Sequence, residues 1–181
     1  IDSVVGWPID WVLIVHDRYG RTHDFLRESG TARYAITAER IYWSDAATDM
    51  VDDMGYVLAG VSAGLAFYRP DSGSPYTGKN LEYLGLASGK IATFLRHGIP
   101  VIMNDIGLYS ELARKHNFGI VARDVRQVGV ILASIDVHAL SENATKFFGE
   151  YLDFIKYKGC IWKRFIGVVN THGERKGRCS C

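Results

Sequence analysis

Short, continuous apolar runs recur along the chain. Between them lie longer segments in which apolar residues recur at helical spacing. The runs lie at residues 11–16, 40–43, 63–68, 99–103 and 118–122, and polar or turn-forming residues bound them. Runs that are apolar at nearly every position suit strands buried on both faces of a sheet. The pattern therefore predicts a parallel sheet that helices cover on both sides.

Four segments between and after these runs have the spacing of amphipathic helices. They lie at residues 21–30, 45–61, 107–117 and 141–166. This alternation predicts an α/β fold, a doubly wound, Rossmann-like parallel sheet of about five to six strands. In such a fold we expect ligands to bind at the carboxyl ends of the strands.

Composition is that of one globular domain: the chain has 181 residues, of which 48% are hydrophobic and 23% charged. We expect residues 1–166 to form this domain and residues 167–181 to form a flexible basic tail. The formal net charge of +1 argues against binding to nucleic acid, which needs a concentrated basic surface. No apolar run approaches the roughly 20 residues that span a bilayer, so we expect no transmembrane segment.

The cysteines bear on the compartment and on metal binding. Cys160 stands alone and Cys179 and Cys181 close the chain, which is too few for a disulfide framework. We therefore expect a cytoplasmic protein, with peripheral attachment to the inner membrane face as the alternative. The terminal cysteines lack histidines at ligand spacing, and the acidic residues at 45–53 suit a helix start, so we assign no metal site.

The segment "LASGKIATFLRHG" has the chemistry of an anion site at a helix start. Ser88 is suited to cap the helix, and Gly89 allows a ligand to approach the backbone closely. The helix dipole and the charge of Lys90 both favour an anion there. Any capped helix start can carry the same three residues. A Walker A loop is excluded, because that motif needs glycine where the chain has Leu84 and serine or threonine where it has Ile91.

The order of segments over residues 10–165 resembles the carboxy-terminal, donor-binding half of bacterial GT-B glycosyltransferases. The resemblance is strongest over residues 63–104, "AGLAFYRPDSGSPYTGKNLEYLGLASGKIATFLRHGIPVIMN", where several residue types occur in a fixed order. It implies a domain that holds the diphosphate of a nucleotide sugar, a UDP- or GDP-sugar, for hexosyl transfer in polysaccharide biosynthesis. It implies no required cofactor.

Site residues follow from this resemblance. It implies that the diphosphate lies against Ser88, Gly89 and Lys90. The loop before them is expected to face the sugar and phosphates through Tyr68, Arg69, Lys79 and Asn80. The end of the first strand would lie near the donor through His16 and Asp17, and the nucleobase would lie near Trp43 and Ser44. No catalytic residue is assigned.

The chain departs from the family pattern in two ways. Family members often carry a glutamate pair whose second member binds the ribose, and here the two positions are Gly85 and Thr93. The chain also begins about ten residues before its first apolar run. We therefore expect the opening β-α unit and the acceptor-binding amino-terminal domain to be missing, and transfer to depend on that domain.

Two alternatives to this interpretation stay open. The chain can be a non-catalytic remnant that acts as a nucleotide-binding or assembly module, or a doubly wound domain for another phosphorylated ligand. Apolar residues at 147–157 are expected to lie partly in the core and partly on the surface toward the missing domain, where the exposed ones can drive self-association.

Overall fold

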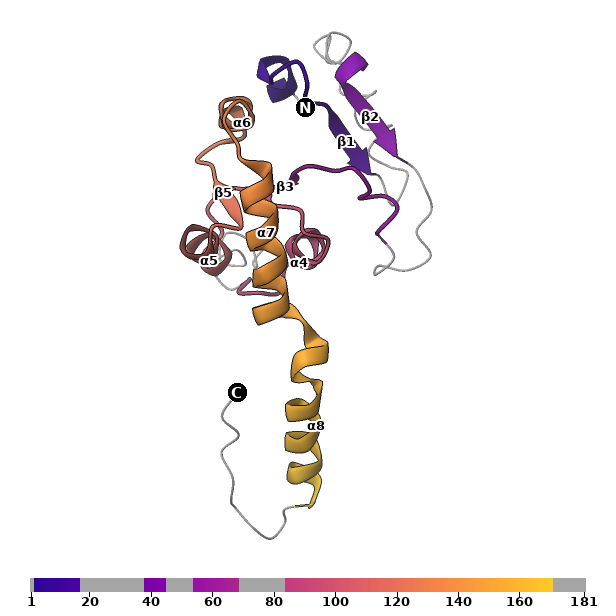
Figure 1. Cartoon of the computed structure of the whole chain (residues 1–181). Coiled ribbons are helices and arrows are strands. Elements are labelled where there is room, and N and C mark those ends of the chain that lie inside the picture. Colours follow the sequence, from indigo (N-terminus) through magenta and orange to yellow (C-terminus); the bar gives the residue numbers. More distant parts are fainter. Residues whose placement is uncertain (1, 17–37, 45–53, 69–83, 171–181) are drawn as a thin grey trace, which may run out of the picture.

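The strands form two parallel sheets in the computed structural model, which describes residues 2–16, 38–44, 54–68 and 84–170 (Figure 1). One sheet pairs β1 (Leu13–His16) with β2 (Ile41–Ser44). The other has the order β3 (Gly64–Ala66), β4 (Val101–Met103), β5 (Gly119–Val121). The predicted α/β class with parallel strands is confirmed. A single sheet of five to six strands is not seen among the described residues, because β1 does not pair with β3 and both strands line a cavity instead.

The register of both sheets brings the carboxyl ends of the strands together. His16 lies opposite Ser44 in the first sheet. Ala66 lies opposite Met103, and Met103 opposite Val121, in the second. In each sheet the carboxyl ends of the strands therefore lie at one edge.

Helices and helical turns occupy most of the remaining described chain. In order they are η1 (Asp2–Gly6), η2 (Ala38–Arg40), α4 (Gly89–Arg96), α5 (Leu108–His116), η3 (Val125–Gln127), α6 (Val128–Leu132), α7 (Val137–Phe147), the π-helical turn η4 (Phe148–Leu152) and α8 (Phe154–Asn170). Figure 1 shows α4, α5 and α7 around the three-stranded sheet and α8 extending away from it. None of the described helices has the length and hydropathy that a membrane-spanning helix needs.

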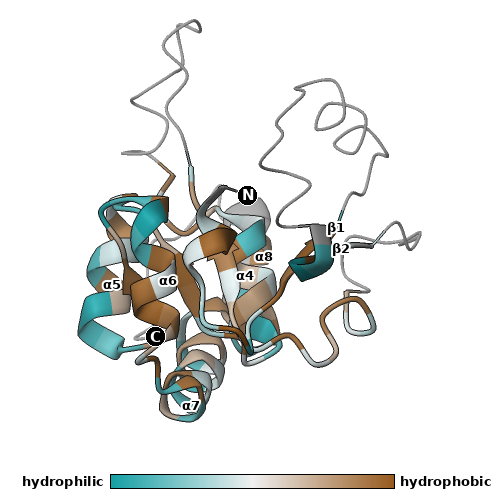
Figure 2. Ribbon diagram, turned by 90° about the horizontal axis from the view of Figure 1, so that it is seen from above, coloured by the Kyte–Doolittle hydropathy of each residue, from teal (hydrophilic) through white to brown (hydrophobic). Residues whose placement is uncertain are grey.

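Apolar clusters cover both faces of the three-stranded sheet. Val101 and Met103 of β4 are buried in a cluster with side chains of α4, α5 and α7, and Ile102 faces a second cluster. The second cluster joins β4 to η1, α6 and the sheet of β1 and β2. Figure 2 shows the polar side of α5 on the outside of the molecule. Alternation along β4 therefore gives the two-sided burial that its apolar sequence predicts.

Arg40 fixes the start of β2 to the amino-terminal segment. Its guanidinium group donates hydrogen bonds to the backbone carbonyl oxygens of Val4, Trp7, Pro8 and Trp11. Two of these oxygens also accept a backbone hydrogen bond within their own turn, that of Val4 from the Trp7 amide (3.1 Å) and that of Pro8 from the Trp11 amide (3.1 Å). A carbonyl oxygen has two lone pairs, so it can accept from the guanidinium group as well. One cation thus holds residues 4–11 against the start of β2.

The helix predicted over residues 45–61 is not formed in the part of it that the structure describes. Residues 54–61 form turns, in which the Leu58 amide donates to the Met54 carbonyl (2.9 Å) and the Val61 amide to the Leu58 carbonyl (3.0 Å). Gly60 has a φ of +77°, which no right-handed helix accommodates. Apolar residues at helical spacing therefore do not build a helix here. The other part of that prediction, residues 45–53, and the predicted helix at 21–30 lie outside the described residues.

The predicted amphipathic segment over 141–166 is divided rather than continuous. α7 passes into η4, and Asp153 then adopts an extended conformation with φ −72° and ψ 101°. The Asp153 carboxylate accepts a hydrogen bond from the Ile155 amide (3.0 Å) at the start of α8. α8 is therefore a separate helix, and it runs beyond residue 166 to Asn170.

Candidate functional site

The start of α4 has the cap that the sequence predicts. Ser88 is buried in an extended conformation, and its hydroxyl accepts a hydrogen bond from the Ile91 amide (3.2 Å). Gly89 is exposed, and a Cβ built at this residue would meet no atom within 4 Å. Lys90 is exposed beside it. The first turn of α4 is therefore open to a ligand on its positive side.

Tyr68 connects this helix start to the end of β3. Its hydroxyl oxygen lies 2.5 Å from the Ser88 hydroxyl oxygen. The Lys90 ammonium lies 5.3 Å from the centre of the Tyr68 ring, a distance at which ring and cation attract each other. Tyr68, Ser88 and Lys90, three of the site residues that the resemblance implies, therefore lie together although Tyr68 follows β3 and the other two lie at the start of α4.

Asn104 holds Tyr68 in this position, a role that the sequence did not reveal. The Asn104 side chain accepts from the Tyr68 amide (2.8 Å) and donates to the Tyr68 carbonyl (2.9 Å). This pair of bonds joins the residue after β4 to the chain that leaves β3. The only signal in the sequence is a polar residue directly after an apolar run, "IPVIMN".

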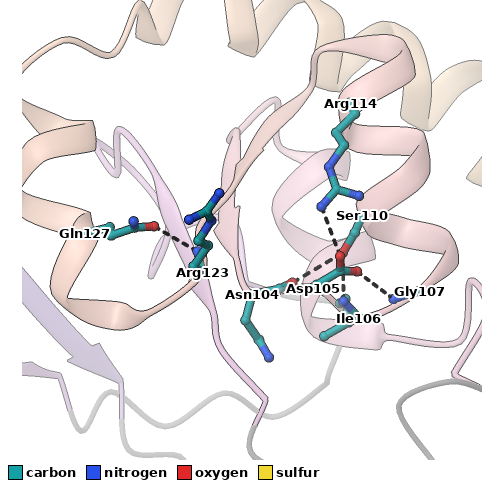
Figure 3. A network of polar contacts seen from close by, with 8 residues as sticks. All are labelled: Asn104, Asp105, Ile106, Gly107, Ser110, Arg114, Arg123 and Gln127. Atoms are coloured by element: carbon teal, nitrogen blue, oxygen red, sulfur yellow. Dashed lines mark hydrogen bonds and ion pairs between the residues drawn. The ribbon is translucent and has the colours of Figure 1, made fainter.

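Side chains also fix the connection from β4 to α5 (Figure 3). The Ser110 hydroxyl accepts from the Ile106 amide (2.7 Å) and donates to the Asn104 carbonyl (3.3 Å). Arg114 donates to the Asp105 carboxylate (3.0 Å), and this hydrogen bond is the main reason why the pKa of Asp105 lies below its usual value. The loop beyond β4 is therefore held from several sides.

A cavity of about 860 Å³ lies between the two sheets. Its walls include residues 12–16 before and within β1, residues 60–65 before and within β3, and Gly89, Lys90 and Thr93 of α4. This volume lies within the roughly 300–1,000 Å³ typical of small-molecule sites. The open start of α4 and the end of β1 therefore border one cavity.

His16 is the polar residue of β1 at this cavity. Its Nδ1 atom lies 3.2 Å from the Ser44 hydroxyl, across the carboxyl ends of β1 and β2. Its Nε2 atom is buried and has no hydrogen-bond partner among the described residues. Buried polar atoms in native proteins are nearly always paired, so an orphaned ring nitrogen at a cavity wall suits a ligand that supplies the partner.

Tyr109 supports the turn that precedes α4. It is fully buried, and its hydroxyl donates to the Leu86 carbonyl (3.2 Å). Burial, and to a smaller extent the nearby Tyr68, raises the pKa of Tyr109 to about 12. The residues before Ser88 are therefore held by a neutral phenol of α5.

The structure thus brings together part of the set that the resemblance implies. Gly89, Lys90 and His16 border one cavity, with Tyr68, Ser88 and Ser44 in contact with them or adjacent. Thr93, which stands where the family often has a ribose-binding glutamate, borders the same cavity. Outside the described residues lie Asp17, Arg69, Lys79, Asn80 and the side chain of Trp43.

No metal site is found in the described part of the chain, where no three His, Cys, Asp or Glu side chains lie close enough together to hold one ion.

Comparison with models of protein families, with curated proteins and with solved structures gives no match to the chain. The resemblance to GT-B glycosyltransferases therefore rests on the sequence motifs and stays a prediction.

Proposed function

We propose that the chain binds the diphosphate of a nucleotide sugar at the first turn of α4, as the donor-binding domain of a GT-B glycosyltransferase. The observation that carries the proposal is the exposed start of α4, with Gly89 and Lys90, at a cavity that His16 also lines. Amide groups at a helix start and an adjacent ammonium group are the donors that phosphate oxygens prefer. On this proposal the two sheets are parts of one Rossmann-like layer.

Each residue has a distinct role in the proposed complex. Gly89 lets the phosphate approach the backbone, and Lys90 neutralises its charge. His16 bonds the rest of the ligand through the Nε2 atom that otherwise lacks a partner. Thr93 offers a neutral hydroxyl where a carboxylate would bind ribose diols. These residues explain donor binding, and transfer of the sugar would also require an acceptor held against it.

Thermal unfolding with added ligands tests this proposal. UDP or GDP at about 100 times its dissociation constant would stabilise the folded state by about 2.7 kcal/mol. For a domain of this size that corresponds to a rise in Tm of roughly 5–10 °C. Inorganic phosphate and NAD, added separately, test the alternative of a different phosphorylated ligand.

Three variants locate the binding. Lys90→Ala should abolish most of the shift for every phosphorylated ligand, and His16→Ala should weaken the shift for nucleotides more than that for phosphate. Lys115→Ala removes an exposed lysine from α5, far along the chain from the proposed site, and should keep the full shift. The proposal is wrong if no nucleotide shifts Tm at millimolar concentration, or if Lys90→Ala responds like the unmodified chain.

A further inference from the structure

Helix α8 stands apart from the packed body of the molecule. Figure 1 shows it extending away from the three-stranded sheet. Neither apolar cluster of the described residues contains a side chain beyond Leu152. The contacts at its start are polar, because the Tyr157 hydroxyl and the Lys156 ammonium both donate to the Glu150 carbonyl. With 17 residues, the helix is about 25 Å long.

The side chains of α8 are divided into an apolar and a basic face. Phe154, Trp162 and Phe165 are spaced at eight and three residues, which places them on one face, and they are 63%, 65% and 67% exposed. Lys156 and Lys163, seven residues apart, lie on the opposite face, and both are exposed. Such a large exposed apolar area next to cations is typical of a surface that binds a partner molecule or a membrane.

The charge of α8 indicates what kind of partner covers its apolar face. α8 contains Lys156, Lys158, Lys163 and Arg164, and no aspartate or glutamate. The sequence after it, residues 171–181, adds three more cations and one glutamate. A basic amphipathic helix with tryptophan and phenylalanine on its apolar face is typical of helices that lie in the headgroup region of a bilayer. Anionic phospholipids supply the complementary charge.

A second copy of α8 is a poorer partner for this face. Four cations without a carboxylate would repel four cations in a symmetric pair of helices. Lys158 also lies four residues from both Phe154 and Trp162, so it interrupts the apolar face. In a dry helix pair this ammonium would be buried without a partner. At a bilayer its methylene chain can lie among the apolar side chains while the ammonium reaches the phosphates.

We propose that α8 attaches the protein to the surface of an anionic membrane, with its apolar face among the acyl chains and its cations at the lipid phosphates. The helix lies along the surface and does not cross it, because four cations in 17 residues exclude a spanning position. This proposal does not depend on nucleotide binding by α4.

Flotation of the full 181-residue chain with lipid vesicles tests the proposal. One set of vesicles contains phosphatidylcholine alone, and in the other about a third of the lipid is phosphatidylglycerol. The chain should float with the anionic vesicles and much less with the neutral ones, and added salt should weaken the binding. The emission of Trp162 should shift to shorter wavelength on binding, and Trp162→Phe serves to identify its contribution among the four tryptophans.

Matched double variants assign the binding to α8. Lys156→Gln with Lys163→Gln should weaken binding to anionic vesicles about 30-fold, at roughly fivefold for each cation. Trp162→Ser with Phe165→Ser should weaken it about tenfold or more, since both apolar side chains then lose their insertion into lipid. The control, Lys115→Gln with Lys146→Gln, removes two exposed lysines from α5 and α7 and should change binding little.

Three outcomes would overturn the proposal. The first is no binding to anionic vesicles at low salt. The second is equal loss of binding in the α8 variants and the control, which would show that general charge on another surface is responsible. The third is a dimer in lipid-free solution that Trp162→Ser with Phe165→Ser dissociates, because the apolar face would then be occupied by a second copy.

Discussion

Ser88 joins two elements through one hydroxyl group. It caps α4 through the Ile91 amide and contacts the Tyr68 hydroxyl beyond β3. The start of α4 is therefore positioned by a contact within the chain segment and by one from a distant strand. Any anion bound by Gly89 and Lys90 would depend on both contacts.

Replacing Ser88 by alanine should lower the free energy of unfolding by about 1–2 kcal/mol through loss of the cap. Tyr68→Phe should cost about 1 kcal/mol, and the double variant should cost less than the sum, because the two hydroxyls contact each other. Urea unfolding of the four proteins measures the coupling. Strictly additive losses would contradict the contact.

Tyr109 should make the protein sensitive to alkaline pH. Its folded pKa of about 12 lies above the unfolded value of about 10, so the folded state binds its proton more tightly. This contribution to stability is complete below about pH 10 and is lost as the pH rises toward about 12. Tyr109→Phe should remove that part of the alkaline loss, at a cost near neutral pH of about 1 kcal/mol for the hydrogen bond to Leu86.

Unfolding in urea between about pH 8 and pH 11 measures this dependence. Tyr42→Phe, a change at an exposed residue of β2, provides the control and should keep the alkaline loss. An unchanged alkaline slope in Tyr109→Phe would show that another group is responsible.

At the scale of elements, β4 and β5 are held closely together because β5 begins with glycine. A Cβ built at Gly119 would lie 2.3 Å from the Val101 carbonyl oxygen, which is backbone and cannot turn aside. The partner strand β4 is buried on both faces, so it has no room to move away.

Gly119→Ala should therefore destabilise the protein by about 1–3 kcal/mol, the usual range for overpacking a core. Gly149→Ala is the matched control, because a Cβ at that residue would meet nothing within 4 Å. That change should be neutral, or stabilising by up to about 1 kcal/mol. Thermal unfolding of both variants gives the comparison, and equal effects would refute the close approach as the cause.

At the scale of the molecule, α7 and α8 differ sharply although one amphipathic segment was predicted over both. α7 contributes Leu140, Ala144 and Phe147 to the buried residues. α8 contributes none to either apolar cluster. The folded body should therefore depend on α7 and not on α8.

Removal of residues 154–181 should change Tm by less than about 2 °C, because few stabilising contacts are lost. A shorter chain that ends at Asp136 should fail to fold, because it lacks the three buried side chains of α7. Thermal unfolding followed by circular dichroism measures both. A large loss of Tm on removal of α8 alone would show that this helix supports the body.

The sequence alone determined the features that depend on near neighbours along the chain. Apolar runs located the strands, and the cap chemistry of Ser88 located the start of α4, since hydrogen bonds within a turn and the alternation of faces are local. It also determined the amphipathic character of α8, because side-chain spacing on a helix follows from its geometry.

Only the tertiary structure decided what depends on segments far apart in the sequence. It divided the strands into two sheets with a cavity between them, placed Asn104 against Tyr68, and brought His16 and Lys90 to one cavity. It also showed that residues 54–61 turn where apolar spacing predicted a helix. Each of these features is set by packing and hydrogen bonds across the fold, and local propensity is too weak to specify such contacts.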